Sequence, residues 1–84
     1  MEFIYTAQAI RQLQALDRGD QKRIGQKMRF FAEQPDPMIF AKPLSGYHGI
    51  YRFRIGALRV VFEVTGTKAY VLLIAPRDSV YKGL

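Results

Sequence analysis

Five side chains in the second half of the chain are suited to binding a phosphate-rich molecule: Arg52, Arg54, Arg59, Arg77 and Tyr81. A guanidinium group presents its donors in a planar fork and can pair with two oxygens of one phosphate. A tyrosine ring can stack on an exposed base; for Tyr81 the alternative is an aromatic side chain folded back onto the core. These groups can act together only if the fold brings them to one surface.

Arg52 and Arg54 belong to a segment with a two-residue repeat. Over residues 50–55 they alternate with aromatic and aliphatic side chains, which predicts a strand with both arginines on one face. Arg59 begins the alternation in the next segment, 58–64. If the hairpin register aligns the two strands, the three arginines form one cluster. Like charges brought together on a sheet reduce stability, so a cluster predicts a bound anion; a merely solvent-exposed charged face is the alternative.

The overall charge also favours an anionic partner. The 84 residues include 13 Lys and Arg against 7 Asp and Glu, a formal net charge of +6. No acidic residue lies between Asp36 and Glu63, whereas Lys42 and three of the arginines do. This distribution predicts a phosphate-bearing or acidic partner. A surface charge that only confers solubility is the alternative interpretation.

The N-terminal half predicts a strand followed by two helices. A short apolar run after the initial Met-Glu is typical of a strand, and Thr6 is placed to cap a helix over about residues 7–17. Gly19 is expected to end that helix. Asp20 is expected to cap a second helix that continues to about Glu33.

The second half predicts a sheet. Residues 36–49 contain prolines and glycines and are expected to form a loop, with local order around 38–40. Three strands are predicted after this loop: 50–55, 58–64 and 69–75. The order of elements predicts one α+β domain over residues 1–84, with an N-terminal strand and a two-helix hairpin packed on a twisted, mainly antiparallel sheet.

Other reactive groups are weaker candidates. His48 lies in a glycine-flanked turn without a nearby cluster of ligands, so an exposed side chain without a metal is expected. Ser45 and Ser79 have no visible base. Glu63 is expected on the arginine face, as a counter-charge rather than a base. Three aromatic residues are expected in the core rather than in a stacking surface: Phe30, Phe31 and Phe40.

The composition argues against several classes of protein. Without cysteine there is no disulfide framework and no thiolate metal site. No apolar run approaches the roughly 20 residues that span a bilayer, and the N-terminus lacks the features of a signal peptide. Glycine-rich phosphate loops are absent. We therefore expect a cytoplasmic protein without a metal or cofactor.

Four motifs follow one another in an order typical of one family. A leucine-x-glycine turn at 44–46 precedes a basic strand over 49–56 and an arginine-led strand over 58–64. Near the end, 74–81 places an arginine before valine and tyrosine. This ensemble resembles the RelE/ParE superfamily, the toxins of type II toxin–antitoxin systems, across essentially the whole chain. The resemblance implies a RelE/ParE-like fold.

The resemblance also implies an activity. RelE-type toxins enter the ribosomal A site and cleave mRNA by attack of a ribose 2′-hydroxyl on the adjacent phosphate. By this likeness Arg52, Arg54 and Arg59 bind RNA phosphates, and Arg54 and Arg59 are also catalytic. Arg77 assists the leaving group and Tyr81 orients or stacks the nucleotide. Arg54 stands where well-studied RelE toxins have lysine, and a guanidinium is a poor base, so its implied role is charge stabilisation.

The partners implied by the resemblance are a cognate acidic antitoxin, the ribosome and mRNA. Two alternatives are open: a ParE-like inhibitor of DNA gyrase, and an inactive homologue that only binds its antitoxin. The basic side chains at all four matched positions, together with Tyr81, favour the endoribonuclease. A second departure from the family is Pro76, where many relatives have histidine or another polar residue.

Overall fold

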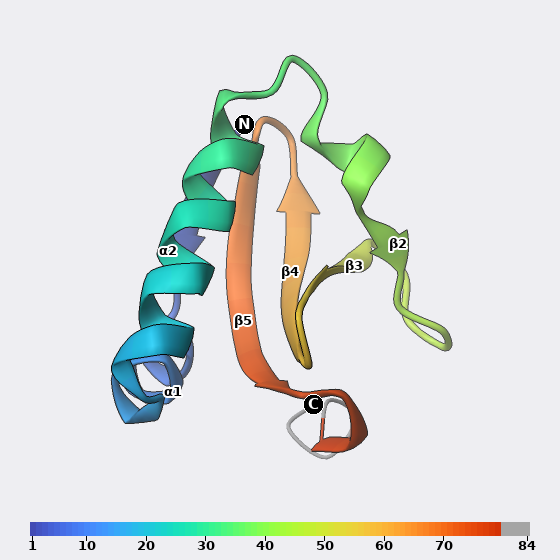
Figure 1. Ribbon diagram of the computed structural model, residues 1–84. Coiled ribbons are helices and arrows are strands. Elements are labelled where there is room, and N and C mark those ends of the chain that lie inside the picture. Colours follow the sequence, from blue (N-terminus) through green and yellow to red (C-terminus); the bar gives the residue numbers. More distant parts are fainter. Residues whose placement is uncertain (80–84) are drawn as a thin grey trace.

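The computed structural model describes residues 1–79, which form two α-helices and a five-stranded sheet (Figure 1). The α-helices and strands are β1 Glu2–Tyr5, α1 Ala7–Ala15, α2 Arg18–Glu33, β2 Lys42–Pro43, β3 Ile50–Ile55, β4 Leu58–Thr65 and β5 Lys68–Pro76. Two short 3-10 helices are η1 Pro37–Phe40 and η2 Arg77–Ser79. The predicted α+β class is confirmed. None of the helices in this part of the chain is long and apolar enough to cross a membrane.

The sheet has the strand order β1-β5-β4-β3-β2, with β1 parallel to β5 and the other neighbours antiparallel. The three predicted C-terminal strands are confirmed to within one residue at each end. The predicted loop over 36–49 contains an unpredicted strand, β2, whose Lys42 pairs with Arg52. Two residues at a sheet edge, one of them a proline, carry no alternating pattern from which a strand can be predicted.

Two-residue turns fix the register of both hairpins. Gly56 and Gly66 are the first turn residues, with φ of 61° and 63°. A positive φ at this position followed by a negative one matches the type II′ turn, whose twist suits antiparallel strands. Because the β3–β4 turn has only two residues, Ile55 pairs with Leu58 and the next pair outward is Arg54 with Arg59.

The boundary between the helices differs from the prediction. The α2 helix begins before Gly19, and its N-cap is Asp17, whose carboxylate accepts a hydrogen bond from the Asp20 amide at 2.7 Å. The predictions that Gly19 ends the first helix and that Asp20 caps the second are therefore wrong. Asp20 lies instead within the first turn, where its negative charge complements the helix dipole. The cap predicted at Thr6 is confirmed.

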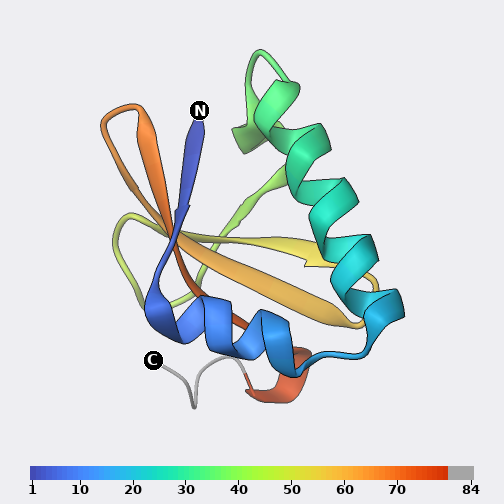
Figure 2. The same ribbon diagram turned by 90° about the vertical axis from the view of Figure 1, so that its left-hand side faces the viewer.

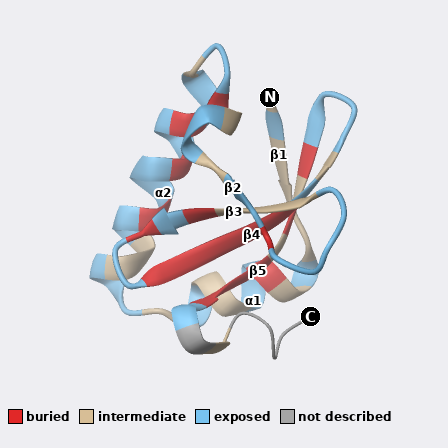
Figure 3. Cartoon of the chain, turned by 90° about the vertical axis from the view of Figure 1, so that its right-hand side faces the viewer, coloured by how far each residue is buried: buried red, intermediate tan, exposed pale blue. Residues whose placement is uncertain are grey.

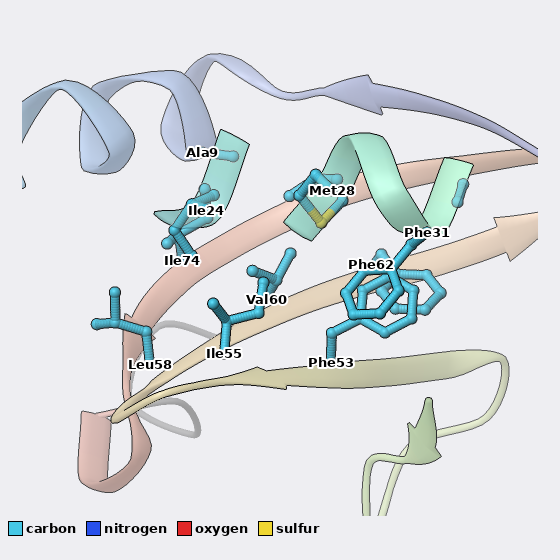
Figure 4. Packing of buried hydrophobic residues seen from close by; sticks show 12 residues of the cluster. Ala9, Ile24, Met28, Phe31, Phe53, Ile55, Leu58, Val60, Phe62 and Ile74 are labelled. Atoms are coloured by element: carbon cyan, nitrogen blue, oxygen red, sulfur yellow. The ribbon is translucent and has the colours of Figure 1, made fainter. Parts of the chain in front are cut away.

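Both helices lie on one face of the sheet and diverge from their short connection (Figures 1 and 2). The helical spacing of Ile24, Met28 and Phe31 places them on one face of α2, and all three are buried. Phe31 stacks on Phe53 at 4.0 Å between ring centroids, and Phe53 stacks on Phe62 at 4.5 Å. Figure 4 shows these rings filling the space between α2 and the central strands. This core holds β3 and β4 against the helices.

A β-bulge gives the opposite face of the sheet an apolar floor. The β4–β5 register shifts between Val61 and Phe62, so β5 contains one extra residue, Leu72. In a strand of regular alternation Leu73, two residues after Val71, would share the helix-covered face with it. The extra residue instead allows a second buried cluster, which comprises Leu44, Val61, Leu73 and Ala75. Figure 3, seen from the side away from the helices, shows β4 buried along most of its length.

The edge of β5 pairs with β1 as far as Val71, and beyond that residue it is covered by α1. The parallel pairing of β1 ends at Val71, and the Thr6 amide donates to the carbonyl of that residue at 3.0 Å. Further along, the Gln12 side-chain oxygen accepts a hydrogen bond from the Ile74 amide at 2.8 Å. A helix side chain thus satisfies a backbone donor that no neighbouring strand reaches. The contact fixes β5 three residues before Arg77.

We predict that Gln12→Met lowers the free energy of unfolding by about 1–3 kcal/mol, because the Ile74 amide would lose its acceptor while staying buried. Urea denaturation measures the change. Gln14→Met, on the exposed side of the same helix, is the matched control and should change stability by less than about 0.5 kcal/mol. Equal effects of the two substitutions would contradict this account of the β5 edge.

Candidate nucleic-acid interface

The register of β3 and β4 brings the predicted arginines together on the face away from the helices. Arg54 lies directly opposite Arg59. Arg52 projects from the same face two residues away, opposite Val61. The alignment on which the predicted cluster depended is therefore present.

The arginines line a cleft of about 390 Å³. Its lining residues are Phe40, Lys42, Leu44, Arg52, Arg54, Arg59 and Arg77. Arg77 follows β5 directly, and its neighbour Pro76 pairs with Leu58 in β4. Cations from β2, β3, β4 and the end of β5 therefore converge, and the described lining contains no carboxylate.

Arg59 is the least exposed of these cations. Its residue is only 6% exposed, and its Nη1 atom donates to the Leu58 carbonyl at 3.3 Å. Burial, together with the positive charges of Arg54, Arg52 and Arg77, lowers the pKa of Arg59. It forms no ion pair with any of the side chains that the structure describes. A buried guanidinium among like charges lacks compensation that an anion in the cleft would supply.

The apolar cluster beneath the cleft strengthens this effect. Arg59 pairs with Ala75 across the sheet and lies two residues from Val61 on the same face. Leu44 closes the cluster from the segment after β2 and also lines the cleft. Because the surrounding groups are apolar, attraction between the arginines and a bound anion is screened less than on an open surface.

Several other predicted candidates lie outside the cleft lining. Glu63 is exposed, pairs with Ile50, and makes no ion pair with the arginines in the described part of the chain. His48 is exposed, as expected, and so is Ser45, while Ser79 is half-buried at the end of η2. Tyr81 lies outside the described residues. Among the described side chains, no three His, Cys, Asp or Glu residues are grouped so as to hold a metal ion.

The aromatic prediction is only partly right. Phe31 is in the core, but Phe30 and Phe40 are 44% and 40% exposed. The buried face of α2 consists of Ile24, Met28 and Phe31, which follow the helical period. Phe30 does not lie on that face. Phe40 ends η1 and faces the cleft, with Lys42 two residues later. The exposure of Phe40 could not be predicted from periodicity, because η1 is a single short turn.

The fold that carries this cleft is similar to that of several solved structures. No protein-family model and no curated protein sequence matches the chain. A chain of the RelB-RelE antitoxin–toxin complex from Methanococcus jannaschii is similar, with a TM-score of 0.76 and 22% identity over 94% of this chain and 95% of that one. The RelBE2 toxin–antitoxin complex from Mycobacterium tuberculosis contains a chain with a TM-score of 0.74 and 21% identity, covering 90% and 96%.

The isolated RelE toxin of E. coli matches over 96% of this chain and 90% of its own length, with a TM-score of 0.72 and 17% identity. The chain has the RelE fold. The RelE-like architecture predicted from four short motifs is therefore confirmed. In this RelE fold the cleft lies on the sheet face that the helices leave open.

The burial of Arg59 among other cations should lower the stability of the protein when no anion is bound. We expect Arg59→Met to raise the melting temperature of the phosphate-free protein by about 5 °C, roughly 1 kcal/mol, because an apolar side chain replaces a buried, uncompensated charge. Inorganic phosphate should stabilise the parent by mass action and the variant much less.

Thermal denaturation in sodium phosphate and in sodium chloride of equal ionic strength measures both effects. Arg11→Met, an exposed position on α1, is the control for loss of one positive charge. If Arg59→Met unfolds the domain, or if phosphate stabilises it as strongly as the parent, the role assigned to Arg59 is wrong.

Proposed function

We propose that the protein is the toxin of a type II toxin–antitoxin pair and cleaves mRNA on the ribosome. The observation that carries this proposal is the convergence of four arginines and Lys42 on one cleft with an apolar floor. The similar solved structures are described as RelE toxins and as complexes with an antitoxin. The motifs that line the cleft are those on which the resemblance to RelE-type toxins rests.

The cleft suits the charge changes of RNA cleavage. In the proposed reaction the 2′-oxygen forms a bond to the adjacent phosphorus while the bond to the 5′-oxygen breaks, which leaves a 2′,3′-cyclic phosphate and a 5′-hydroxyl. Negative charge accumulates on the phosphoryl oxygens as the new bond forms. Arg54 and Arg59 face each other where they can stabilise that charge. Arg77, on the η2 side of the cleft, is assigned to the departing 5′-oxygen, which must gain a proton.

The arginines of the described lining are not suited to removing the 2′-proton, which passes to solvent water in the proposed reaction. Their guanidinium groups are poor bases, and the lysine of the described lining, Lys42, pairs with Arg52 rather than with Arg54 or Arg59. We assign the contribution of these residues to positioning and charge stabilisation, with the ribosome aligning the message. Tyr81, which lies outside the described residues, keeps its proposed role in orienting the nucleotide.

An acidic antitoxin fits the same surface. The net charge of +6 favours a partner that carries carboxylates, and so do the arginines of the cleft, which pair with none of the described carboxylates. Such a partner would supply the compensation that Arg59 lacks, and would exclude RNA by occupying the cleft. Action on translated mRNA places the toxin in the cytoplasm.

We predict that expression of the chain alone stops translation and produces cuts within translated codons. Primer extension on a reporter message should show new 5′ ends that disappear when its start codon is removed. Arg77→Ala should abolish these cuts while the protein stays folded, because its side chain is exposed. Double-strand DNA breaks with intact mRNA would instead identify gyrase as the target. Normal growth would indicate an inactive homologue.

We predict that Arg54→Lys gains a pH-dependent rate. A lysine among cations has its pKa lowered, and its neutral form can accept the 2′-proton. The cleavage rate should therefore rise with pH through that pKa and then level off, whereas the parent stays flat. Single-turnover cleavage on programmed ribosomes measures the profile. A drop of tenfold or more, about 1.4 kcal/mol, with a flat profile would show that Arg54 serves only to grip phosphate.

A further inference from the structure

One wall of the cleft is aromatic, and the phosphate chemistry makes no use of it. Phe40 lines the cleft beside the cations and is 40% exposed. An exposed phenylalanine costs free energy in water unless something apolar covers it. Apart from the apolar Leu44, the other residues that line this site are cations.

The Phe40 ring is held in place by its surroundings. It contacts Phe30 at 5.5 Å between centroids with an interplanar angle of 70°, and Phe31 at 5.4 Å with 39°. Phe31 in turn stacks on the buried Phe53. The backbone is fixed as well, since the Ala41 amide donates to the Met38 carbonyl at 3.1 Å. A ring supported through the core needs little ordering when a ligand binds.

The cations and the ring are arranged for a ligand with both a phosphate and a flat apolar part. Lys42 follows Phe40 closely and pairs with Arg52 across β2 and β3. Arg59 lies on β4, one strand further from β2 than Arg52. The row of cations across the cleft therefore extends over two strand spacings, about 10 Å. A phosphate held by Arg54 and Arg59 therefore leaves an attached nucleoside room to reach the β2 side, where Phe40 forms the wall.

We propose that Phe40 is a base-stacking residue, whose exposed ring binds a nucleobase of the RNA that the arginines hold by its phosphates. This inference rests on the proposed function and adds a subsite to it. Stacking on an aromatic side chain tolerates any base, because every base has a π-face. The subsite therefore adds affinity for nucleotides over inorganic phosphate without selecting a sequence.

Binding of a short RNA to the purified protein tests the subsite. The probe is a trinucleotide with 2′-O-methyl sugars, which cannot be cleaved, carrying 2-aminopurine at one position in turn. Phe40→Leu should weaken binding by about five- to twentyfold and abolish the quenching of 2-aminopurine that stacking produces. Phe40→Trp should retain both. Ile39→Ala is the matched control, since Ile39 belongs to the same short helix, is 72% exposed and does not line the cleft.

An abasic version of the probe separates stacking from other effects. Loss of the base should weaken binding to the parent about as much as Phe40→Leu does, and should have no further effect in that variant. Inorganic phosphate should stabilise the parent and Phe40→Leu equally. If Phe40→Leu binds the intact probe as tightly as the parent while Arg59→Met does not, the subsite is refuted and the proposed phosphate site stands. If Arg59→Met also binds normally, the phosphate site itself is refuted.

Discussion

Two arginines that face each other across a tight hairpin are the constraint on which the rest of this molecule depends. The two-residue turn at Gly56 leaves the strands no freedom of register, so Arg54 must lie opposite Arg59. Directly opposed like charges oppose sheet formation. The hairpin forms nevertheless, because the other faces of the same strands bury Phe53, Ile55 and Val60 against the helices. Apolar burial on one face thus holds together a charge arrangement that would not persist by itself.

The β-bulge in β5 and the contact of α1 with that strand also serve both faces of the sheet. The bulge at Leu72 directs Leu73 and Ala75 toward the arginine face, where they form an apolar floor. The α1 helix then secures the bulged end of β5 through Gln12. The bulge and the Gln12 contact both lie near the C-terminal end of β5, which is followed directly by Arg77. The contacts that stabilise the fold and those that position the cations are therefore coupled through β5, although the two sets lie on opposite faces.

Strand alternation was enough to predict the arginine cluster, because a period of two and a short glycine turn determine which side chains share a face. The buried face of α2 was predictable from its period for the same reason. Two features were not predictable. The cap at Asp17 competed with an equally suitable Asp20 three residues later, and only the three-dimensional course of the chain selects between them. Arg59 shares its cleft with Leu44 and Arg77, which lie far from it in sequence, so the strand pattern alone does not predict its burial.

Charge alone does not determine which anion occupies this cleft. The buried Arg59 is compensated equally by a phosphodiester and by a carboxylate, since both present paired oxygens to a guanidinium. Selection between RNA and an acidic protein must therefore come from groups that interact with the rest of the ligand. In the proposed subsite Phe40 is such a group, because an aromatic ring can stack on a planar base but offers an acidic side chain no partner. An antitoxin that competes for the arginines would then have to cover Phe40 with apolar side chains of its own, and would carry them beside its carboxylates.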